Sequence, residues 1–225
     1  MPEGATPGAD RSDFRASPEP ADARDAADVP EPTDAQRTAA AALVAAQERS
    51  VQLDAGWSVG PTGMRTRHAA RVLLVDDQDR VLVVRGHDAD EPSRHWWFTV
   101  GGGIDPGESA HEAAVREVFE ESGLRVAPED LVGPVVTRSA IFDFARESCL
   151  QHEEFFFARV AHDGRLVRDG WTEIETGFID EMAWLTTTEL RATTDEVFPR
   201  DLPDIVDDLV AGWDGVVRAI GLERD

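Results

Sequence analysis

The chain of 225 residues lacks lysine and tyrosine altogether, and it holds a single cysteine, Cys149. One cysteine excludes an intrachain disulfide framework and a multi-cysteine zinc site, so we expect Cys149 to be a half-buried structural thiol. No apolar run reaches the roughly 18 residues that span a bilayer. The N-terminus also has no basic segment followed by an apolar core. These absences predict a cytoplasmic protein with no membrane partner.

Positive charge is scarce as well. The chain carries 45 acidic residues against 22 basic ones, all arginine, for a formal net charge of −23. Such a surface repels phosphate backbones, which makes duplex nucleic acid an unfavourable partner. We expect a small-molecule partner instead, and a polyanionic one would need a bridging cation or a local cluster of arginines. A homodimer stays open.

The composition divides the chain into three parts. Residues 1–36 are rich in Pro, Ala, Asp and Glu and are predicted to form a disordered tail, because they offer little apolar surface to bury. Residues 37–66 are predicted to form a helical extension, with an Ala-rich helix over 34–49, and a loop or added strand. Residues 67–225 are predicted to be the folded domain.

Hydrophobic periodicity in that domain predicts an α/β sandwich with a mixed sheet. The first two strands are separated by four polar residues, 76–79, which predict a hairpin turn and not a calcium loop. The expected strands are 70–75, 80–84, 96–100, 132–138, 141–144, 154–160 and 182–185, and the expected helices are 109–122, 186–193 and 202–220.

The helix at 109–122 carries clear end signals. Ser109 with Glu112 three residues later is typical of a capping box, and Gly123 is placed to end the helix. At about 100° per residue, Glu117, Glu120 and Glu121 fall on one face. The apolar residues Val115, Val118 and Phe119 fall on the opposite face, which we expect to be buried.

Three carboxylates at this spacing destabilise a helix by a few tenths of a kcal/mol for each pair. A sequence selected only for stability would interleave basic residues there, whereas clustered carboxylate oxygens are the ligands that Mg²⁺ or Mn²⁺ prefers. Just upstream, Gly101, Gly102 and Gly103 let the backbone approach a metal or a phosphate closely. Arg116 is expected to pair with Glu108 and brace this corner against the helix.

The segment from Gly102 to Leu124 resembles the Nudix box, Gly-x5-Glu-x7-Arg-Glu-U-x-Glu-Glu-x-Gly-U, where U is bulky and apolar. This sequence supplies all nine specified positions at the required spacing: Gly102, Glu108, Arg116, Glu117, Val118, Glu120, Glu121, Gly123 and Leu124. One neighbouring position departs from the common pattern, because relatives often have proline where this chain has Val100.

The resemblance implies a Nudix-type α/β/α sandwich that hydrolyses nucleoside diphosphates linked to another moiety, with Mg²⁺ as cofactor and Mn²⁺ as a substitute. Carried over by motif position, Glu117, Glu120 and Glu121 are the expected metal ligands and catalytic residues. The Gly102 carbonyl is an expected further ligand, and Gly102 and Gly103 are expected to meet the substrate. Glu108 and Arg116 are implied to be structural supports.

Three residues outside the box are candidate site residues, and each also has a purely structural interpretation. Glu153, before the Phe-rich strand, is a candidate catalytic base or metal ligand, or else a solvated strand end. Arg85 at the end of the second strand is a candidate phosphate contact or a surface arginine. Trp96 is a candidate for stacking on a base, although of two adjacent tryptophans one usually lies in the core and one at its rim.

The leading functional hypothesis is therefore a metal-dependent hydrolase of a phosphoanhydride bond. A ligand-sensing or regulatory Nudix-fold module that no longer hydrolyses is the first alternative, and an acidic interaction protein is the second. Binding alone would not require all three glutamates, and a merely solvated acidic face would not explain the glycine corner.

Overall fold

The computed structural model describes residues 56–88, 91–144, 147–162, 166 and 177–225. The predictions for the acidic tail and for a helix over 34–49 fall outside the described residues. All the elements below belong to the compact unit Glu48–Asp225.

Within the described residues, ten strands form one mixed sheet, accompanied by helices and one short 3-10 turn. The strands are β1 Ser58–Val59, β2 Arg65–Val75, β3 Val81–His87, β4 His95–Thr99, β5 Gly101–Gly103, β6 Val132–Phe144, β7 Glu147–Arg159, β8 Ile179–Leu185, β9 Glu196–Val197 and β10 Arg218–Arg224. The helical elements are α2 Ala110–Ser122, η1 Pro128–Asp130, α4 Thr187–Ala192 and α5 Leu202–Ala211.

Strand β2 is the centre of this sheet, whose main order is β10-β6-β7-β2-β3-β4-β9. It runs parallel to β7 along its whole length but pairs with β3 only where Val75 meets Val81. Because β2 and β3 share so short a contact, β5 can pair with β2 at Ala69–Arg71. The glycine corner thus enters the sheet as a strand of its own.

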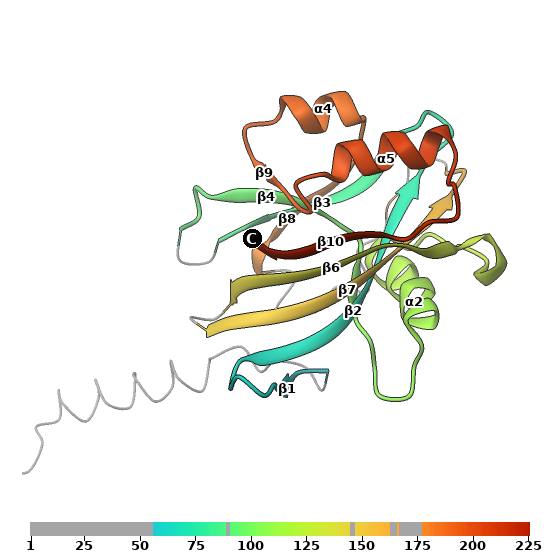
Figure 1. Ribbon diagram of the computed structural model, residues 1–225. Coiled ribbons are helices and arrows are strands. Elements are labelled where there is room, and N and C mark those ends of the chain that lie inside the picture. Colours follow the sequence, from blue (N-terminus) through green and yellow to red (C-terminus); the bar gives the residue numbers. More distant parts are fainter. Residues whose placement is uncertain (1–55, 89–90, 145–146, 163–165, 167–176) are drawn as a thin grey trace, which may run out of the picture. The chain divides into compact units, whose positions relative to one another are not determined.

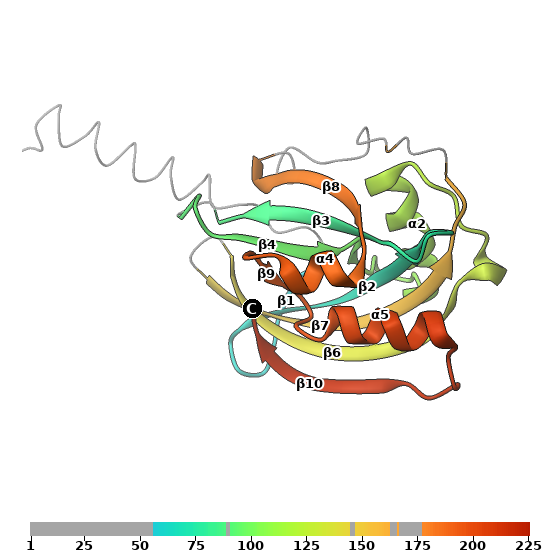
Figure 2. The same ribbon diagram turned by 90° about the horizontal axis from the view of Figure 1, so that it is seen from above.

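Apolar side chains form one core on each face of the sheet. On one face, Val72 and Leu74 of β2 pack with Ala114 and Val118 of α2. On the other face, Leu73 of β2 packs beneath α4 and α5. Figure 1 shows α4 and α5 together on one side of the sheet with α2 on the other, and the view from above in Figure 2 agrees. This arrangement confirms the predicted α/β/α sandwich with a mixed sheet.

The end signals of α2 are confirmed. Ser109 accepts a hydrogen bond from the Glu112 backbone N–H, and the Glu112 side chain accepts one from the Ser109 backbone N–H, which completes the capping box. Gly123 follows the helix in the left-handed conformation, with φ 73°. The helix predicted at 186–193 also begins with a capping box, formed by Thr186 and Glu189.

The prediction of a single helix over 202–220 is wrong. Helix α5 ends at Ala211, and Gly212 and Gly215 follow with φ of 131° and 86°, a conformation that ends a helix and that glycine tolerates best. The chain then forms β10, parallel to β6. The end of the predicted helix, from Arg218 on, therefore belongs to an edge strand, because β6 offers backbone hydrogen bonds that the local sequence does not reveal.

Several predicted strands are also shorter than the observed strands. Strands predicted at 132–138 and 141–144 are one strand, β6, and the strand predicted at 154–160 is β7, which begins at Glu147. Polar residues within β6 and β7 interrupt the apolar pattern, since they pair with one another across the sheet. Cys149 lies inside β7 and is fully buried. Among the described residues, no helix is long and apolar enough to cross a bilayer.

The β2–β3 hairpin is held by one buried carboxylate, that of Asp76. It is fully shielded from solvent and accepts hydrogen bonds from the Gln78 and Arg80 backbone N–H groups, at 2.9 and 2.8 Å, and from Arg80 Nε at 2.7 Å. Burial alone would raise the pKa of Asp76, but the hydrogen bonds from Arg80, His162 and Gln78 outweigh it and lower the pKa below its ordinary value.

We predict that Asp76→Asn destabilises the protein in a pH-dependent way. A carboxyl whose folded pKa is depressed stabilises the fold above its unfolded pKa of about 3.9 and loses that effect as pH falls through the folded value. The free energy of unfolding should therefore fall by about 2 kcal/mol at pH 7 relative to wild type, and this difference should shrink as pH falls below the unfolded pKa of about 3.9. Urea unfolding across this pH range measures it.

Asp79→Asn is the matched control. Asp79 has φ 59°, which Asn also tolerates, and its side chain is 56% exposed in its ion pair with Arg159. This change should cost less than about 0.5 kcal/mol. A loss for Asp76→Asn that is the same at pH 3 and pH 7 would refute the role given to the Asp76 charge.

Candidate functional site

Helix α2 carries all three box carboxylates, but they do not share one solvated face. Glu117 and Glu121 are only 8% and 6% exposed, whereas the Glu120 side chain is 48% exposed. The prediction that Phe119 is buried is wrong, since it is 44% exposed with the Arg125 guanidinium 4.1 Å above its ring. Small alanines fill the sheet side of α2, so the helix packs closely and carries Glu117 and Glu121 into the structure beside Val118.

The glycine corner receives two of these carboxylates. The Gly101 N–H donates to Glu121 Oε2 at 2.9 Å. A Cβ added at Gly102 would lie 2.6 Å from Glu117 Oε1, so the Glu117 carboxylate rests directly against that glycine. Val100, the departure from the common pattern, is fully buried and accepts a hydrogen bond from the Val72 N–H at 2.9 Å, which fixes the corner to β2.

Arg116 binds the loop to the helix. Its Nε and Nη2 donate to Glu108, each at 2.9 Å, which confirms the predicted pair, and Nη2 also donates to the Gly103 carbonyl at 3.0 Å. Its Nη1 contacts Glu117 Oε1 at 2.8 Å and Glu120 Oε2 at 3.1 Å. One guanidinium therefore contacts two box carboxylates and the preceding loop at once.

The pKa values of these groups follow from their partners. The hydrogen bond from Arg116 lowers the pKa of Glu108, and the same bond raises the pKa of Arg116. Burial raises the pKa of Glu117 above its ordinary value, because the attraction of Arg116 only partly offsets the loss of hydration.

The donor chemistry of this site fits a hard divalent cation. Among the residues that the structure describes, no three His, Cys, Asp or Glu side chains already form a ligand group. However, Glu117 and Glu120 converge on a single cationic nitrogen of Arg116, and Glu121 lies one turn further along the same helix. Carboxylate oxygens that converge on one cation are suited to Mg²⁺ or Mn²⁺.

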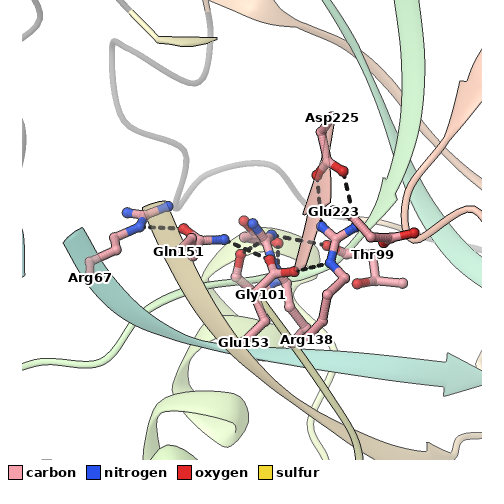
Figure 3. Close-up of polar contacts among 10 residues, drawn as sticks. Arg67, Thr99, Gly101, Arg138, Gln151, Glu153, Glu223 and Asp225 are labelled. Atoms are coloured by element: carbon pink, nitrogen blue, oxygen red, sulfur yellow. Dashed lines mark hydrogen bonds and ion pairs between the residues drawn. The ribbon is translucent and has the colours of Figure 1, made fainter. Parts of the chain in front are cut away.

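Glu153 is not a solvated strand end. It lies inside β7 with its side chain 2% exposed, opposite Arg138 of β6. Oε1 accepts from Arg71 Nε at 3.1 Å and from Gln151 Nε2 at 2.6 Å, and Oε2 accepts from Arg138 Nε at 2.6 Å (Figure 3). Burial alone would raise the pKa of Glu153, but the two arginines outweigh it and lower the pKa.

The structure therefore does not bring Glu153 into direct contact with the α2 carboxylates. Arg71 lies between them, because its Nη1 donates to the Gly101 carbonyl at 2.5 Å while its Nε holds Glu153. Both oxygens of Glu153 already accept strong hydrogen bonds, and a depressed pKa makes a poor proton acceptor.

Arg85 and Trp96, the predicted substrate contacts, lie on the paired strands β3 and β4, where Arg85 is opposite Trp97 and not opposite Trp96. Arg85 is half-buried and donates to Asp195 at 2.8 Å, and its guanidinium lies 6.0 Å from the ring of Trp97. Trp97 is the core residue of the tryptophan pair, with 7% exposure, and Trp96 is half-buried with the Arg94 guanidinium 5.4 Å above it. Their roles toward a substrate stay predictions.

Arg71 and Arg138 are the residues of this region that the sequence pattern did not single out. Each is an arginine at an inward-facing position of a buried strand, with side chains 13% and 4% exposed. Arg71 is flanked by Ala70 and Val72, both fully buried. A charged residue inside such an apolar run is the one local signal that could have identified it, because a buried charge requires a partner.

Comparison with known proteins gives a family match that begins at the first residue of strand β2. The model of the NUDIX domain matches residues 65–204. A putative 8-oxo-dGTP diphosphatase of Bacillus subtilis is 31% identical over 101 residues, which cover 45% of this chain and 58% of that protein. The human 8-oxo-dGDP phosphatase NUDT18 is 36% identical over 100 residues, 42% of this chain and 30% of that protein. The matched region thus spans less than two thirds of either relative.

Among solved structures, the MutT protein from Methanosarcina mazei Go1 has a TM-score of 0.45 at 18% identity, covering 63% of this chain and 93% of that one. A C. elegans Ap4A hydrolase has a TM-score of 0.47 at 15% identity, covering 64% and 98%. The domain match covers more than half of the chain and contains the whole glycine corner and helix α2, so the chain belongs to the Nudix family.

Proposed function

We propose that this chain is a Mg²⁺-dependent Nudix hydrolase that cleaves the phosphoanhydride bond of a nucleoside diphosphate linked to another moiety. The observation that carries the proposal is the convergence of Glu117 and Glu120 on one cationic nitrogen, beside a corner that only glycine can form. Relatives in Bacillus subtilis, human and Novosphingobium aromaticivorans support it, since they are named as a putative 8-oxo-dGTP diphosphatase, an 8-oxo-dGDP phosphatase and an RNA pyrophosphohydrolase.

Glu117, Glu120, Glu121 and the Gly102 carbonyl are the groups that would hold the ion. When bound, the ion would neutralise phosphate charge and make the attacking water more acidic. In the overall reaction, the water oxygen forms a bond to one phosphorus and the bridging P–O bond breaks, so that two phosphorylated products leave.

The chain's own residues orient and shield this site. Arg116 holds the loop through Glu108 and Gly103 and keeps two of the carboxylates in place. The burial of Glu117 and Glu121 limits the water around them, which strengthens their attraction for a cation. We assign no proton transfer to Glu153, because both of its oxygens are occupied.

We predict that product formation requires Mg²⁺ or Mn²⁺. A panel of a nucleotide sugar, an ADP-ribose-like dinucleotide and an oxidised nucleoside triphosphate should yield nucleotide products on ion-exchange chromatography. EDTA should abolish turnover and excess Mg²⁺ should restore it, whereas Ca²⁺ should support little, since its looser shell positions water poorly. Turnover that survives exhaustive chelation would refute the metal assignment. Ligand binding without any product would favour the sensing module instead.

We predict that Glu120→Gln separates activity from stability. The amide keeps the size of the side chain but removes the charge, so turnover should fall by about a hundredfold or more, on the order of 3 kcal/mol in barrier. Because Glu120 is about half exposed and its ion pair among the described residues is with Arg116, the free energy of unfolding without metal should change by less than about 0.5 kcal/mol. Glu129→Gln, at an exposed residue of η1, is the control and should change neither quantity. If Glu120→Gln unfolds but its folded fraction keeps normal turnover, Glu120 is a structural residue.

We predict that alanine at Gly101 mainly lowers stability, whereas alanine at Gly102 mainly lowers turnover. A Cβ at Gly101, whose φ is 132°, would lie 2.2 Å from the Ala70 carbonyl oxygen, so Gly101→Ala should cost about 3 kcal/mol or more of stability. At Gly102 the nearest atoms belong to the movable Glu117 carboxylate. Gly102→Ala should therefore cost less than about 1 kcal/mol in chemical denaturation yet lower turnover by about a hundredfold.

Gly177→Ala is the control for an added methyl group, since none of the described residues lies within 4 Å of its Cβ position. It should leave stability and turnover unchanged. Full activity in Gly102→Ala would show that catalysis does not need Glu117 against that glycine.

A further inference from the structure

Arg71 lies at a position where burial of its charged side chain is energetically unfavourable. It lies in the middle of β2 with its side chain 13% exposed, between residues that are fully buried. The guanidinium compensates through directed contacts, donating to Glu153 at 3.1 Å, to the Thr99 carbonyl at 3.2 Å and to the Gly101 carbonyl at 2.5 Å. The last two acceptors lie on either side of the bend between β4 and β5, so one planar group holds both ends of that bend.

Gly101 takes part in two hydrogen bonds, one through its carbonyl and one through its N–H. While the Gly101 carbonyl accepts from Arg71, the Gly101 N–H donates to Glu121. The next residue is Gly102, against which the Glu117 carboxylate rests. Any rotation of the Gly101 backbone would therefore move Glu121 and the surface that receives Glu117 together.

Arg71 is itself held in place by a series of ion pairs on the side away from the corner. Glu153 holds it, and Arg138 holds Glu153 at 2.6 Å. Arg138 in turn donates to Glu223 at 2.9 Å and to Asp225 at 2.7 Å, at the end of β10 (Figure 3). This chain of ion pairs extends from β2, beside the glycine corner, across β7 and β6 to β10 at one edge of the sheet, beyond the residues that the domain model matches.

We propose that Arg71 is a positioning residue for the divalent cation: by fixing the Gly101 carbonyl, with Glu153 as its anchor, it sets the orientation of Gly102, Glu117 and Glu121 as ligands. The inference rests on the proposed function, because it concerns the ion that this function requires. Among the described residues, Arg71 donates to Glu153 and to two backbone carbonyls, and to none of the three box glutamates. It acts through the backbone of the corner, which is why its charge lies behind the ligands and not among them.

The test is direct binding of Mn²⁺, measured by electron paramagnetic resonance of the free ion, alongside kcat and KM with Mg²⁺. Arg71→Lys keeps the charge but loses the planar fork that reaches both sides of the bend. The double variant Arg71→Met with Glu153→Gln removes one charge of each sign, so it leaves no unpaired charge if the lysine variant folds poorly. Arg80→Lys is the matched control, because Arg80 also pairs with a buried carboxylate, that of Asp76, and has no contact with the corner among those described.

We expect the Kd for Mn²⁺ to rise about tenfold or more in both Arg71 variants and to stay within about twofold of wild type in Arg80→Lys. An unchanged Kd in the folded variants would overturn the proposal, even if stability falls. A raised KM for substrate with an unchanged Kd for Mn²⁺ would also overturn it, since Arg71 would then contact substrate directly. If wild type turns over substrate and binds Mn²⁺ while the variants match it, only this inference fails. If wild type does neither, the proposed function fails with it.

Discussion

The close approach of helix α2 to the glycine corner is the constraint on which the rest of the site depends. A side chain at Gly101 would collide with the backbone of β2, and one at Gly102 would displace the Glu117 carboxylate. Because neither glycine has a Cβ, two glutamates of one helix reach the backbone of a strand. The same approach leaves them poorly hydrated, so their charges need a cation, either Arg116 or a metal ion.

Arginine is the only strong cation in this acidic chain, and the structure uses each buried arginine several times. Arg116 contacts three glutamates and one carbonyl, and Arg138 contacts three carboxylates. The planar guanidinium suits this sharing because its donors point in several fixed directions, whereas an ammonium is a point charge. A chain with a net charge of −23 can thus keep acidic residues inside its sheet without leaving them unpaired.

The ion pairs also connect residues inside the matched Nudix domain with residues that lie beyond it. Strand β10 lies beyond residue 204, the last that the domain model matches, yet its neighbouring carboxylates hold Arg138. Through Glu153 and Arg71 this edge strand is connected to the corner beside α2. An addition at the sheet edge can therefore influence the ligands at the centre, because each link is a buried and directional contact.

The sequence by itself determined helix α2, its two ends, the Arg116–Glu108 pair and the set of carboxylates, because capping and side-chain spacing act within one or two helical turns. Local periodicity also predicted a mixed α/β sandwich, whereas the α/β/α order was implied by the resemblance to the Nudix family. Only the tertiary structure decided the rest. Arg71 meets partners 30 and 82 residues away, and Arg138 meets one 87 residues away. Strand β10 formed where local sequence favoured a helix, since β6 supplied the hydrogen bonds. Contacts at such separations depend on how strands are ordered in the sheet, and no local pattern records that order.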